Sequence, residues 1–425
     1  MTRIPNLRWW IAGLLAAATA LNYLDRQNLP VVVSELQKSI PLTDQQYSEL
    51  QFLFLLAYGL MYAGGGRIVD LLGTRAGYLV MIVWWSVANM LHGLVTGVFG
   101  LGTARFLLGL GEGGGFPASA KAVSEWFPAR ERSFAFGLFN TGSSVGAVVA
   151  PPLIAGIVLW LNWRWVFFIT GAFGLLWALI WWRLYELPGK HKLITPEERE
   201  YVETSLRSVQ TAGPRMPWVS LFRFRQVWGL CAAKFLSDSA WYFFIFWLPK
   251  YLADIRHLNI KEIGYYAWVP YAFAGAGSFI GGWLSSYFIQ RGLSIDASRK
   301  IALGISAALM PASLLITASP LSLAIAFFSM AMFGHQFWST IMQTLSADMF
   351  PSTTVGSVSG LLGAVGSFGG MFFNLLVGIL LTHYHSYAIV FLISGLLHPV
   401  SFIVVMLVVR RIEPVVRVGV PAAAR

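Results

Sequence analysis

Long apolar stretches, separated by short polar ones, run through almost the whole chain of 425 residues. Clear examples are residues 76–91, 164–182, 301–318 and 389–409. A helix needs ~20 residues to cross the ~30 Å hydrocarbon core of a bilayer. Runs of this length therefore predict membrane-spanning helices, whereas a β-barrel would show short segments that alternate between polar and apolar positions.

The pattern divides into twelve predicted spans in two groups of six. The spans of the first group are 8–32, 45–66, 76–96, 98–121, 133–159 and 164–186. Those of the second group are 226–251, 263–288, 299–318, 321–345, 355–382 and 387–410. We therefore predict an all-α polytopic membrane protein with two six-helix bundles.

One long polar segment separates the two groups of spans. Within it, Thr195 is placed as a helix N-cap and Pro196 as the first helical residue, which predicts a short surface helix. The predicted domains are an N-terminal bundle (1–186), a cytoplasmic linker with this helix (187–225), and a C-terminal bundle with a tail (226–425).

The two groups repeat part of their sequence. Phe127-Pro128, Gly137-Leu138, Ser144 and Gly146 recur, at a constant offset of about half the chain, as Phe350-Pro351, Gly360-Leu361, Ser367 and Gly369. A constant offset of this size indicates duplication. Parallel six-helix repeats with a central cavity are one of the known transporter architectures.

Composition and charge agree with a membrane protein. Charged residues make up 12% of the chain, against about 25% in a soluble domain. The net charge is +11, but most Lys and Arg residues fall in the N-tail, every second loop and the C-tail. This distribution predicts that both termini are cytoplasmic, and it does not favour nucleic-acid binding. The single cysteine, Cys231, provides neither a disulfide framework nor a thiolate metal cluster, and no cleavable signal peptide is evident.

Charged residues also lie inside predicted spans, where each costs at least ~2.5–3.5 kcal/mol unless it pairs or lines a water-filled path. They are Asp25 and Arg26 in span one, Arg105 and Glu112 in span four, and Lys234 and Asp238 in span seven. These charges are the candidate functional residues.

Span four carries its charges on one stripe. Because successive helical residues turn by ~100°, Arg105, Gly109, Glu112 and Phe116 face the same neighbour. The glycines at 113–115 weaken the helix beside Glu112, and Pro117 removes a backbone hydrogen bond. A bend beside an acid suits a moving part; the alternative is a static ion pair with a packing kink.

Asp25 and Arg26 are adjacent, so their side chains diverge and cannot reach the same binding partner. We expect Asp25 to pair with Arg105 and Arg26 to face the cavity. The guanidinium group stays charged and fits a carboxylate, so Arg26 is a plausible anchor for an anionic substrate. Asp25 and Glu112 can exchange protons, which proton coupling requires.

The second group of spans offers weaker candidates. Lys234 and Asp238 are four residues apart, and either form an intrahelical pair or serve the cavity. His335 and Gln336 fall at the repeat-equivalent position of Glu112, with either a structural role or a role in substrate or proton binding. Residues that could offer stacking faces or polar contacts to a sugar are Tyr58, Ser143, Trp241, Trp338 and Asn374, although Trp and Tyr also anchor helices at membrane interfaces.

The loop between spans two and three contains Gly66, Asp70, Gly73 and Arg75. Gly66 would permit close helix approach, Asp70 would cap the next helix or pair with an Arg, and Gly73 would permit a tight turn. An ordinary polar turn is the alternative. In a twelve-span protein this spacing resembles the gating motif of the major facilitator superfamily. In the second half Gly282 and Arg291-Gly292 recur, but Ser286 replaces the acid.

Further stretches resemble the anion:cation symporter family of that superfamily, and most of all bacterial hexuronate transporters. They are "NYLDRQN", "RFLLGLGEGGGFPASAKAVSEWFPARERS", "GSSVGAVVAPPLI" and "FGHQFWST" with "SADMFP". The resemblance implies proton-coupled uptake of galacturonate or glucuronate across a bacterial inner membrane by alternating access. It also implies that Arg26 and Tyr58 contact substrate, that Asp25 and Glu112 carry the coupling, and that Arg105 is their basic partner. Aldonate carriers often have Gln where Ser143 stands.

Alternative functions remain at this point. A symporter for an aldonate or aldarate, such as galactonate or glucarate, is the nearest. A drug or organic-cation efflux carrier would instead have an acidic, aromatic cavity without Arg26. An enzyme would need clustered catalytic groups, and His92, His335, His383 and His385 are scattered. The expected partners are therefore a sugar acid, protons and the bilayer, with no cofactor, metal or nucleic acid, and the expected state is a monomer.

Overall fold

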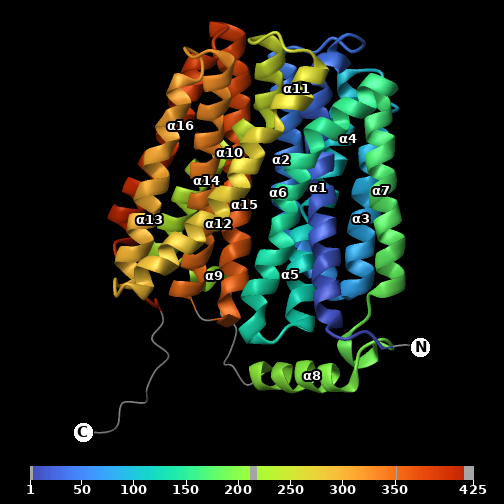
Figure 1. Ribbon diagram of the computed structural model, residues 1–425, viewed down its shortest axis with the longest axis vertical. Coiled ribbons are helices and arrows are strands. Elements are labelled where there is room, and N and C mark those ends of the chain that lie inside the picture. The colour runs from blue at the N-terminus through green and yellow to red at the C-terminus, as the bar shows by residue number, and fades with distance from the viewer. Residues whose placement is uncertain (1–2, 211–217, 351, 416–425) are drawn as a thin grey trace.

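The chain folds into a bundle of long helices (Figure 1). The computed structural model describes residues 3–210, 218–350 and 352–415. Pro351 of the repeat, residues 211–217 of the predicted linker and the tail from 416 onward lie outside the described residues. Within the described part no strand forms, and only an isolated bridge joins Ile4 to Ile194.

The helices of the N-terminal half follow the predicted spans. They are α1 (Leu7–Gln37), α2 (Asp44–Leu72), α3 (Thr74–Leu91), α4 (Val98–Glu112), α5 (Gly115–Trp126), α6 (Ala129–Trp160) and α7 (Trp163–Leu184). Predicted span four is thus divided between α4 and α5. These helices lie side by side on the right in Figure 1.

The second half lies on the left in Figure 1 and begins after the short elements η1 (Pro188–Lys190), α8 (Pro196–Gln210) and α9 (Trp218–Leu221). Its first helices are α10 (Arg225–Asp254), α11 (Ile260–Tyr266), α12 (Trp268–Gln290) and α13 (Ile295–Leu309). The remaining elements are η2 (Met310–Leu315), α14 (Leu321–Met349), α15 (Ser352–Tyr384), α16 (Tyr387–Val404) and η3 (Val405–Val409). The prediction of an all-α polytopic membrane protein is confirmed.

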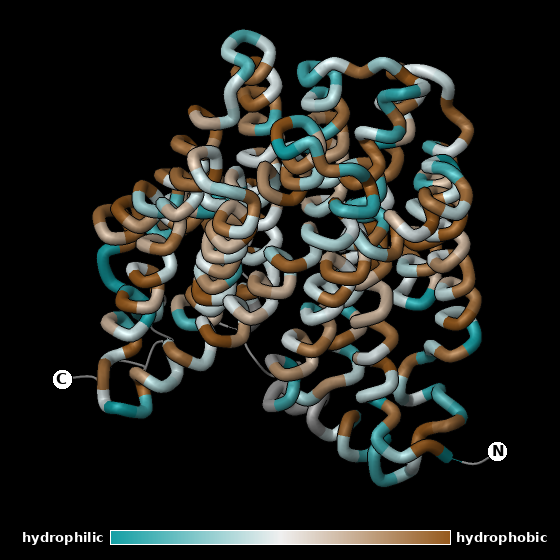
Figure 2. Tube along the Cα trace, turned by 45° about the horizontal axis from the view of Figure 1, so that its top comes forward, coloured by the Kyte–Doolittle hydropathy of each residue, from teal (hydrophilic) through white to brown (hydrophobic). Residues whose placement is uncertain are grey.

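Judged by length and composition alone, six helical segments in the described part are long and apolar enough to cross a membrane. They are Asp44–Leu72, Phe134–Trp160, Trp163–Leu184, Leu321–Met349, Thr354–Tyr384 and Tyr387–Val409. Two other predicted spans contain breaks, because α4 and α13 are each 15 residues long and continue as a second helix. Figure 2 shows hydrophobic residues along the helices and hydrophilic ones gathered mainly at the two ends.

Glycines of the sequence repeat allow equivalent helix crossings in the two halves. A Cβ atom added at Gly146 of α6 would lie 2.2 Å from the carbonyl oxygen of Ala20 in α1. A Cβ atom added at Gly369 of α15 would lie 2.1 Å from the carbonyl oxygen of Phe235 in α10. Small residues of this kind let the backbones of membrane helices approach closely. Repeat-equivalent residues therefore have the same packing role in both halves.

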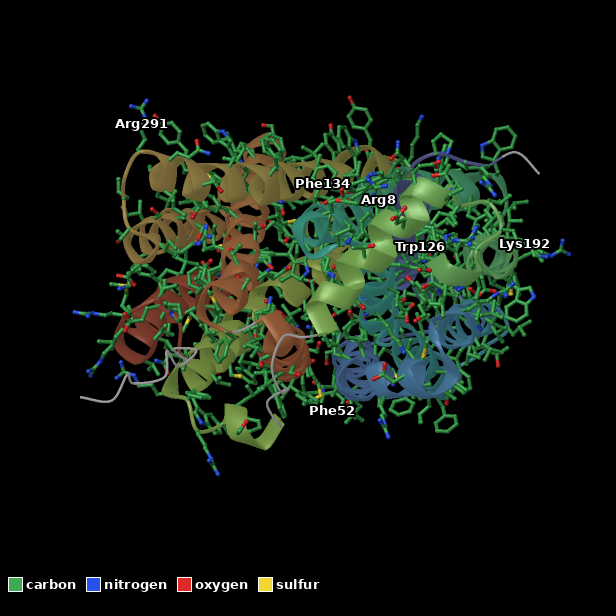
Figure 3. The ribbon with its side chains drawn as sticks, turned by 90° about the horizontal axis from the view of Figure 1, so that it is seen from below. Arg8, Phe52, Trp126, Phe134, Lys192 and Arg291 are labelled. Atoms are coloured by element: carbon green, nitrogen blue, oxygen red, sulfur yellow. The ribbon has the colours of Figure 1, made fainter. Side chains whose placement is uncertain are left out.

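The polar segment between the halves packs on the start of α1. Glu198 of α8 accepts hydrogen bonds from the backbone N–H groups of Leu7, at 2.8 Å, and Arg8, at 3.1 Å. It thereby caps two backbone donors that the helix itself cannot satisfy. Figure 3, viewed from this end, shows α8 lying across the N-terminal half beside Arg8, with Lys192 and Arg291 pointing outward at the rim.

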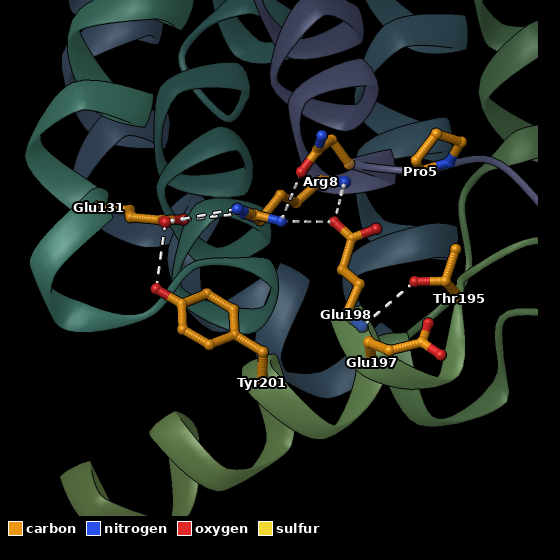
Figure 4. Close-up of a pocket in the computed structure, with 8 residues that line it drawn as sticks. Pro5, Arg8, Glu131, Thr195, Glu197, Glu198 and Tyr201 are labelled. Carbon is orange, nitrogen blue, oxygen red and sulfur yellow. Dashed lines mark hydrogen bonds and ion pairs between the residues drawn. The ribbon is translucent and has the colours of Figure 1, made fainter.

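Side chains strengthen this contact. Arg8 Nη1 lies 2.9 Å from Glu198 and Arg8 Nε lies 2.8 Å from Glu131 of α6. The Tyr201 hydroxyl donates to Glu131 at 3.1 Å (Figure 4). The N-cap of α8 itself is the one indicated by the sequence, since the Glu198 N–H donates to Thr195 Oγ1 at 3.2 Å. Residues of α8 are therefore joined by hydrogen bonds to two helices of the N-terminal half, α1 and α6.

Candidate functional site

Arg26 of α1 and Glu112 of α4 form an ion pair inside the N-terminal half. Nη2 of Arg26 lies 3.0 Å and Nε lies 3.1 Å from Oε2 of Glu112. Arg26 Nη2 also donates to Asn22 Oδ1, one turn earlier in α1, at 3.0 Å. Both charged residues are only 1% exposed. A buried pair of this kind is held by mutual attraction, and it is strongly destabilised when one partner is lost.

Aromatic rings surround the guanidinium group of Arg26. Its central carbon lies 4.6 Å from the ring centroid of Tyr58, 4.8 Å from that of Tyr23 and 5.4 Å from that of Phe54. Cation–π contacts stabilise a cation most where water is excluded. Tyr58 was predicted as a site residue, whereas Tyr23 and Asn22 were not, although Asn22 has the helical spacing that places it beside Arg26.

Asp25 does not pair with Arg105, so this expectation was wrong. Asp25 Oδ1 instead accepts a hydrogen bond from Asn89 Nδ2 of α3 at 2.9 Å. Arg105 donates to Gln51 Oε1 of α2 at 3.3 Å and lies 5.2 Å from the ring centroid of Phe54. The predicted divergence of residues 25 and 26 is present, but α1 is rotated so that the base faces α4 and the acid faces α3.

The helix is interrupted beside Glu112, where the glycines were expected to weaken it. Helix α4 ends at Glu112, and α5 begins at Gly115. The intervening glycines allow close packing, because a Cβ atom at Gly113 would lie 2.5 Å from the Tyr58 carbonyl oxygen and one at Gly114 2.5 Å from Met81 Sδ. Close packing at Gly113 thus places Glu112 directly beside α2, the helix that carries Tyr58.

A second polar cluster lies in the C-terminal half. Lys234 Nζ lies 2.9 Å from Asp238 Oδ1, so the intrahelical pair exists. The ring of His335 stacks on Trp241, with centroids 4.7 Å apart and planes 9° apart. His335 Nδ1 lies 3.0 Å from Nε2 of His398 in α16. His398 was not among the predicted site residues, although it shares with His335 the signal of a lone histidine in an apolar span.

The other predicted substrate contacts differ in their surroundings. Asn374 accepts from Trp247 Nε1 and donates to the Gly370 carbonyl, both at 2.8 Å. Ser143 donates to the Asn140 carbonyl of its own helix at 2.7 Å. Their polar atoms therefore already have partners. Trp338 is fully buried with its edge toward His398, while Gln336 is half-buried.

The two clusters lie on opposite sides of the boundary between the halves, where α1 packs against α10 and α2 against α15. The end of this boundary that lies opposite α8 carries ionic contacts between the halves. Lys250 of α10 is 3% exposed and lies 2.8 Å from Asp44 of α2, and it also pairs with Asp254. The Tyr47 hydroxyl of α2 donates to the Phe246 carbonyl of α10. The two halves are therefore held together at this end.

Most of the predicted loop between spans two and three is helical, because α2 continues to Leu72 and only Gly73 separates it from α3. Asp70 pairs with Lys121 of α5 at 2.8 Å rather than with an Arg. Arg75 pairs with Glu186 at 2.8 Å. Gly73 joins α2 to α3 with a φ of +78°, which only glycine adopts readily. Gly66 makes no close approach, but a Cβ atom at Gly65 would lie 2.9 Å from the Gly114 Cα atom.

Bundles of membrane helices with charged residues buried between them are typical of membrane transporters. The chain matches the model of the Major Facilitator Superfamily over residues 15–334 and 292–424, and it belongs to that family. It is a membrane transporter and not an enzyme.

Among curated relatives, the chain is 36% identical over 387 residues to the hexuronate transporter of Escherichia coli (strain K12), covering 89% of each chain. It is 37% identical over 314 residues to the galacturonate transporter of Dickeya chrysanthemi, covering 73% of this chain and 91% of that protein. The chain is thus similar in sequence to carriers of sugar acids.

A solved structure supports the fold. It is that of a bacterial homologue of the human lysosomal transporter Spinster, in an inward-facing and occupied conformation. The TM-score is 0.74 at 20% identity, with 95% of this chain and 97% of that chain covered. The two chains therefore share the arrangement of their helices.

Proposed function

We propose that the protein takes up a hexuronate, such as galacturonate or glucuronate, together with protons across a bacterial inner membrane by alternating access. The similarity to hexuronate and galacturonate transporters supports the substrate class. The positive charge of the tails and alternate loops supports cytoplasmic termini. Two features of the site support coupling to protons.

The pairing of Arg26 with Glu112 is the observation that carries the proposal. A uronate brings one carboxylate, and the guanidinium group that fits it is already bonded to the Glu112 carboxylate. The two anions compete for one cation. A proton on Glu112 removes its negative charge and frees Arg26 for the substrate, so uptake of the anion and of the proton are linked.

Asp25 is the second proposed proton carrier. It belongs to the same helix as Arg26 but faces α3, where Asn89 donates to it. Its protonation is therefore not in direct competition with the substrate. On the other side of the boundary, Trp241, Lys234, His335 and Gln336 are the proposed contacts for the sugar ring and its hydroxyl groups.

Transport assays in proteoliposomes test this function. Radiolabelled galacturonate should accumulate when the outside is more acidic than the inside, and should only equilibrate when the gradient is collapsed with a protonophore. Glucuronate should compete, and galactonate should compete less well. Uptake that is indifferent to the proton gradient would disprove the symport, whereas preference for galactonate would change only the substrate.

A further inference from the structure

Polar residues of three helices meet in the interior of the N-terminal half, apart from the Arg26–Glu112 pair. We define the polar column as Asp25 and Asn28 of α1, Asn89 of α3, His92 at the C-cap of α3, and Thr170 of α7. In α1, and in α3 with its C-cap, the two residues are three apart, so each pair lies on one helix face. All five residues are fully buried.

Hydrogen bonds connect four members of the polar column. Asn89 Nδ2 lies 2.9 Å from Asp25 Oδ1 and 2.7 Å from Thr170 Oγ1. Asn28 Nδ2 lies 2.8 Å from Thr170 Oγ1 and 3.1 Å from Asn89 Oδ1. Asp25 is therefore joined through Asn89 to Thr170 and Asn28. Asn28 lies one helical turn closer than Asp25 to the α3–α4 loop.

His92 extends the polar column toward that loop. Its Nδ1 lies 3.0 Å from the Ala88 carbonyl oxygen and 3.1 Å from that of Asn89. Because carbonyl oxygens only accept, the ring proton must be on Nδ1, and Nε2 carries a lone pair. The ring is held parallel to Phe167, with centroids 5.0 Å apart and planes 8° apart. Nε2 therefore has a fixed direction.

Three acceptor atoms of the polar column have no hydrogen-bond partner among the described residues. They are Asp25 Oδ2, Asn28 Oδ1 and His92 Nε2. A buried acceptor without a donor costs about 1–3 kcal/mol. Water supplies two donors, and buried waters typically bind two to four polar groups. Acceptors on successive turns are thus suited to a short row of waters.

The polar column ends beside the loop that joins α3 to α4. His92 directly follows α3, which ends at Leu91. Arg164 at the start of α7 donates through Nη1 to the carbonyls of Gly93 and Val95, at 2.8 Å each. These bonds fix the loop that follows His92. Because the chain reaches this loop after three spans, it lies at the end opposite α8.

We propose that the polar column is a hydrated proton route from the α3–α4 loop to Asp25, separate from the boundary where the substrate would bind. Along it each water accepts one proton and passes one on, so the net change is one proton added to the Asp25 carboxylate. His92 acts as a positioning residue that orients a water. This inference rests on the proposed proton symport.

Variants in proteoliposomes test the route. Proton uptake that accompanies galacturonate entry is followed with a pH-sensitive dye, and exchange of labelled for unlabelled galacturonate is followed at equal pH. His92→Phe keeps the ring stack but loses Nε2, and should slow proton uptake at least tenfold with exchange within twofold of wild type. Thr170→Val should act likewise, and His92→Gln, which restores an acceptor, should recover most of the rate.

The control variant is Thr19→Val, whose hydroxyl donates to the Leu15 carbonyl of its own helix and has no other partner in the described part of the chain. It should leave both rates unchanged. Normal proton uptake in His92→Phe and Thr170→Val would overturn the route, as would equal loss of exchange and proton uptake, which indicates a structural role. Asp25→Asn separates the two proposals, because gradient-driven accumulation by that variant would overturn the role of Asp25 in coupling itself.

Discussion

Arg26 gives both of its hydrogen bonds with Glu112 to the same carboxylate oxygen, Oε2, while Oε1 has no partner among the residues that the structure describes. A matched fork would use both oxygens and hold the pair more firmly. The pair is thus arranged so that one carboxylate oxygen is open to a proton while the other binds the base. This arrangement suits an ion pair that must open in each transport cycle.

Replacing Arg26 should abolish substrate binding. Arg26→Lys keeps the charge but loses the planar fork, so we expect at least tenfold weaker galacturonate binding, and no detectable binding for Arg26→Ala. Isothermal titration calorimetry on detergent-purified protein measures both.

Arg26→Ala also leaves Glu112 without its partner, which costs about 3–5 kcal/mol. The double variant Arg26→Ala/Glu112→Gln removes this penalty and should recover the melting temperature without recovering binding. Binding of galacturonate by the double variant at wild-type affinity would rule out the anchoring role.

Glu112→Gln should uncouple transport from protons. The amide resembles a permanently protonated acid, so Arg26 remains available to substrate and exchange continues. Gradient-driven accumulation should be lost, because no proton leaves position 112. Counterflow and accumulation measured in the same vesicles check this, and full accumulation would exclude Glu112 from coupling.

His398 should affect substrate affinity through His335. The two rings share a hydrogen bond of 3.0 Å, so His398→Phe frees one nitrogen of His335 and should raise KM for galacturonate several-fold with little change in Vmax. The control is Ser394→Ala in the same helix, whose hydroxyl donates to the Phe391 carbonyl and, within the described ranges, to nothing else. An unchanged KM in His398→Phe would assign the pair to packing alone.

Lys250 should hold the end opposite α8 closed. Lys250→Met leaves Asp44 and Asp254 without their buried cation, so like charges face each other across the boundary between the halves. A reporter cysteine at the buried Ser48, in a Cys231→Ala background, should react at least fivefold faster with a membrane-impermeant maleimide. The matched control is Lys38→Met, because the exposed Lys38 pairs with Glu35 of its own helix end and with no other acid among the described residues. Equal labelling in both variants would contradict the contact's role.

Glycine at the helix crossings should matter for stability. In Gly146→Ala and Gly369→Ala the new methyl group would collide with a carbonyl oxygen of the neighbouring helix. Overpacking of this kind costs about 1–3 kcal/mol. Gly156→Ala is the control, because no atom lies within 4 Å of the added Cβ atom. Thermal unfolding in detergent should show lower melting temperatures for the first two variants only.

Much of the fold follows from the sequence, because long apolar runs have few alternatives to membrane helices. The break beside Glu112 was also predictable from the glycines at 113–115. The partner of Arg26 could not be predicted, because the rotation of α1 about its axis depends on packing against its neighbours, which the sequence of one helix does not determine. The break between α13 and η2 was missed, although Pro311 was present to signal it.

The candidate site could likewise be predicted from the sequence only in part. Arg26 and Glu112 could be identified from the sequence because each places a charge within an apolar span. The free-energy cost of burying such a charge indicates a functional role. Asn89 and Thr170 were missed because uncharged polar residues are common in membrane helices. Their importance comes from three helices meeting at one point, and this is a property of the tertiary structure.

The bonds from Glu198 to the first backbone N–H groups of α1 bear on how the gene could be divided. If the protein were expressed as two separate polypeptides, a cut just after α7 would take this cap away from the first fragment. A first polypeptide that extends through Gln210 would keep it. We therefore expect co-expressed fragments to reassemble into an active carrier only when the early polypeptide includes α8.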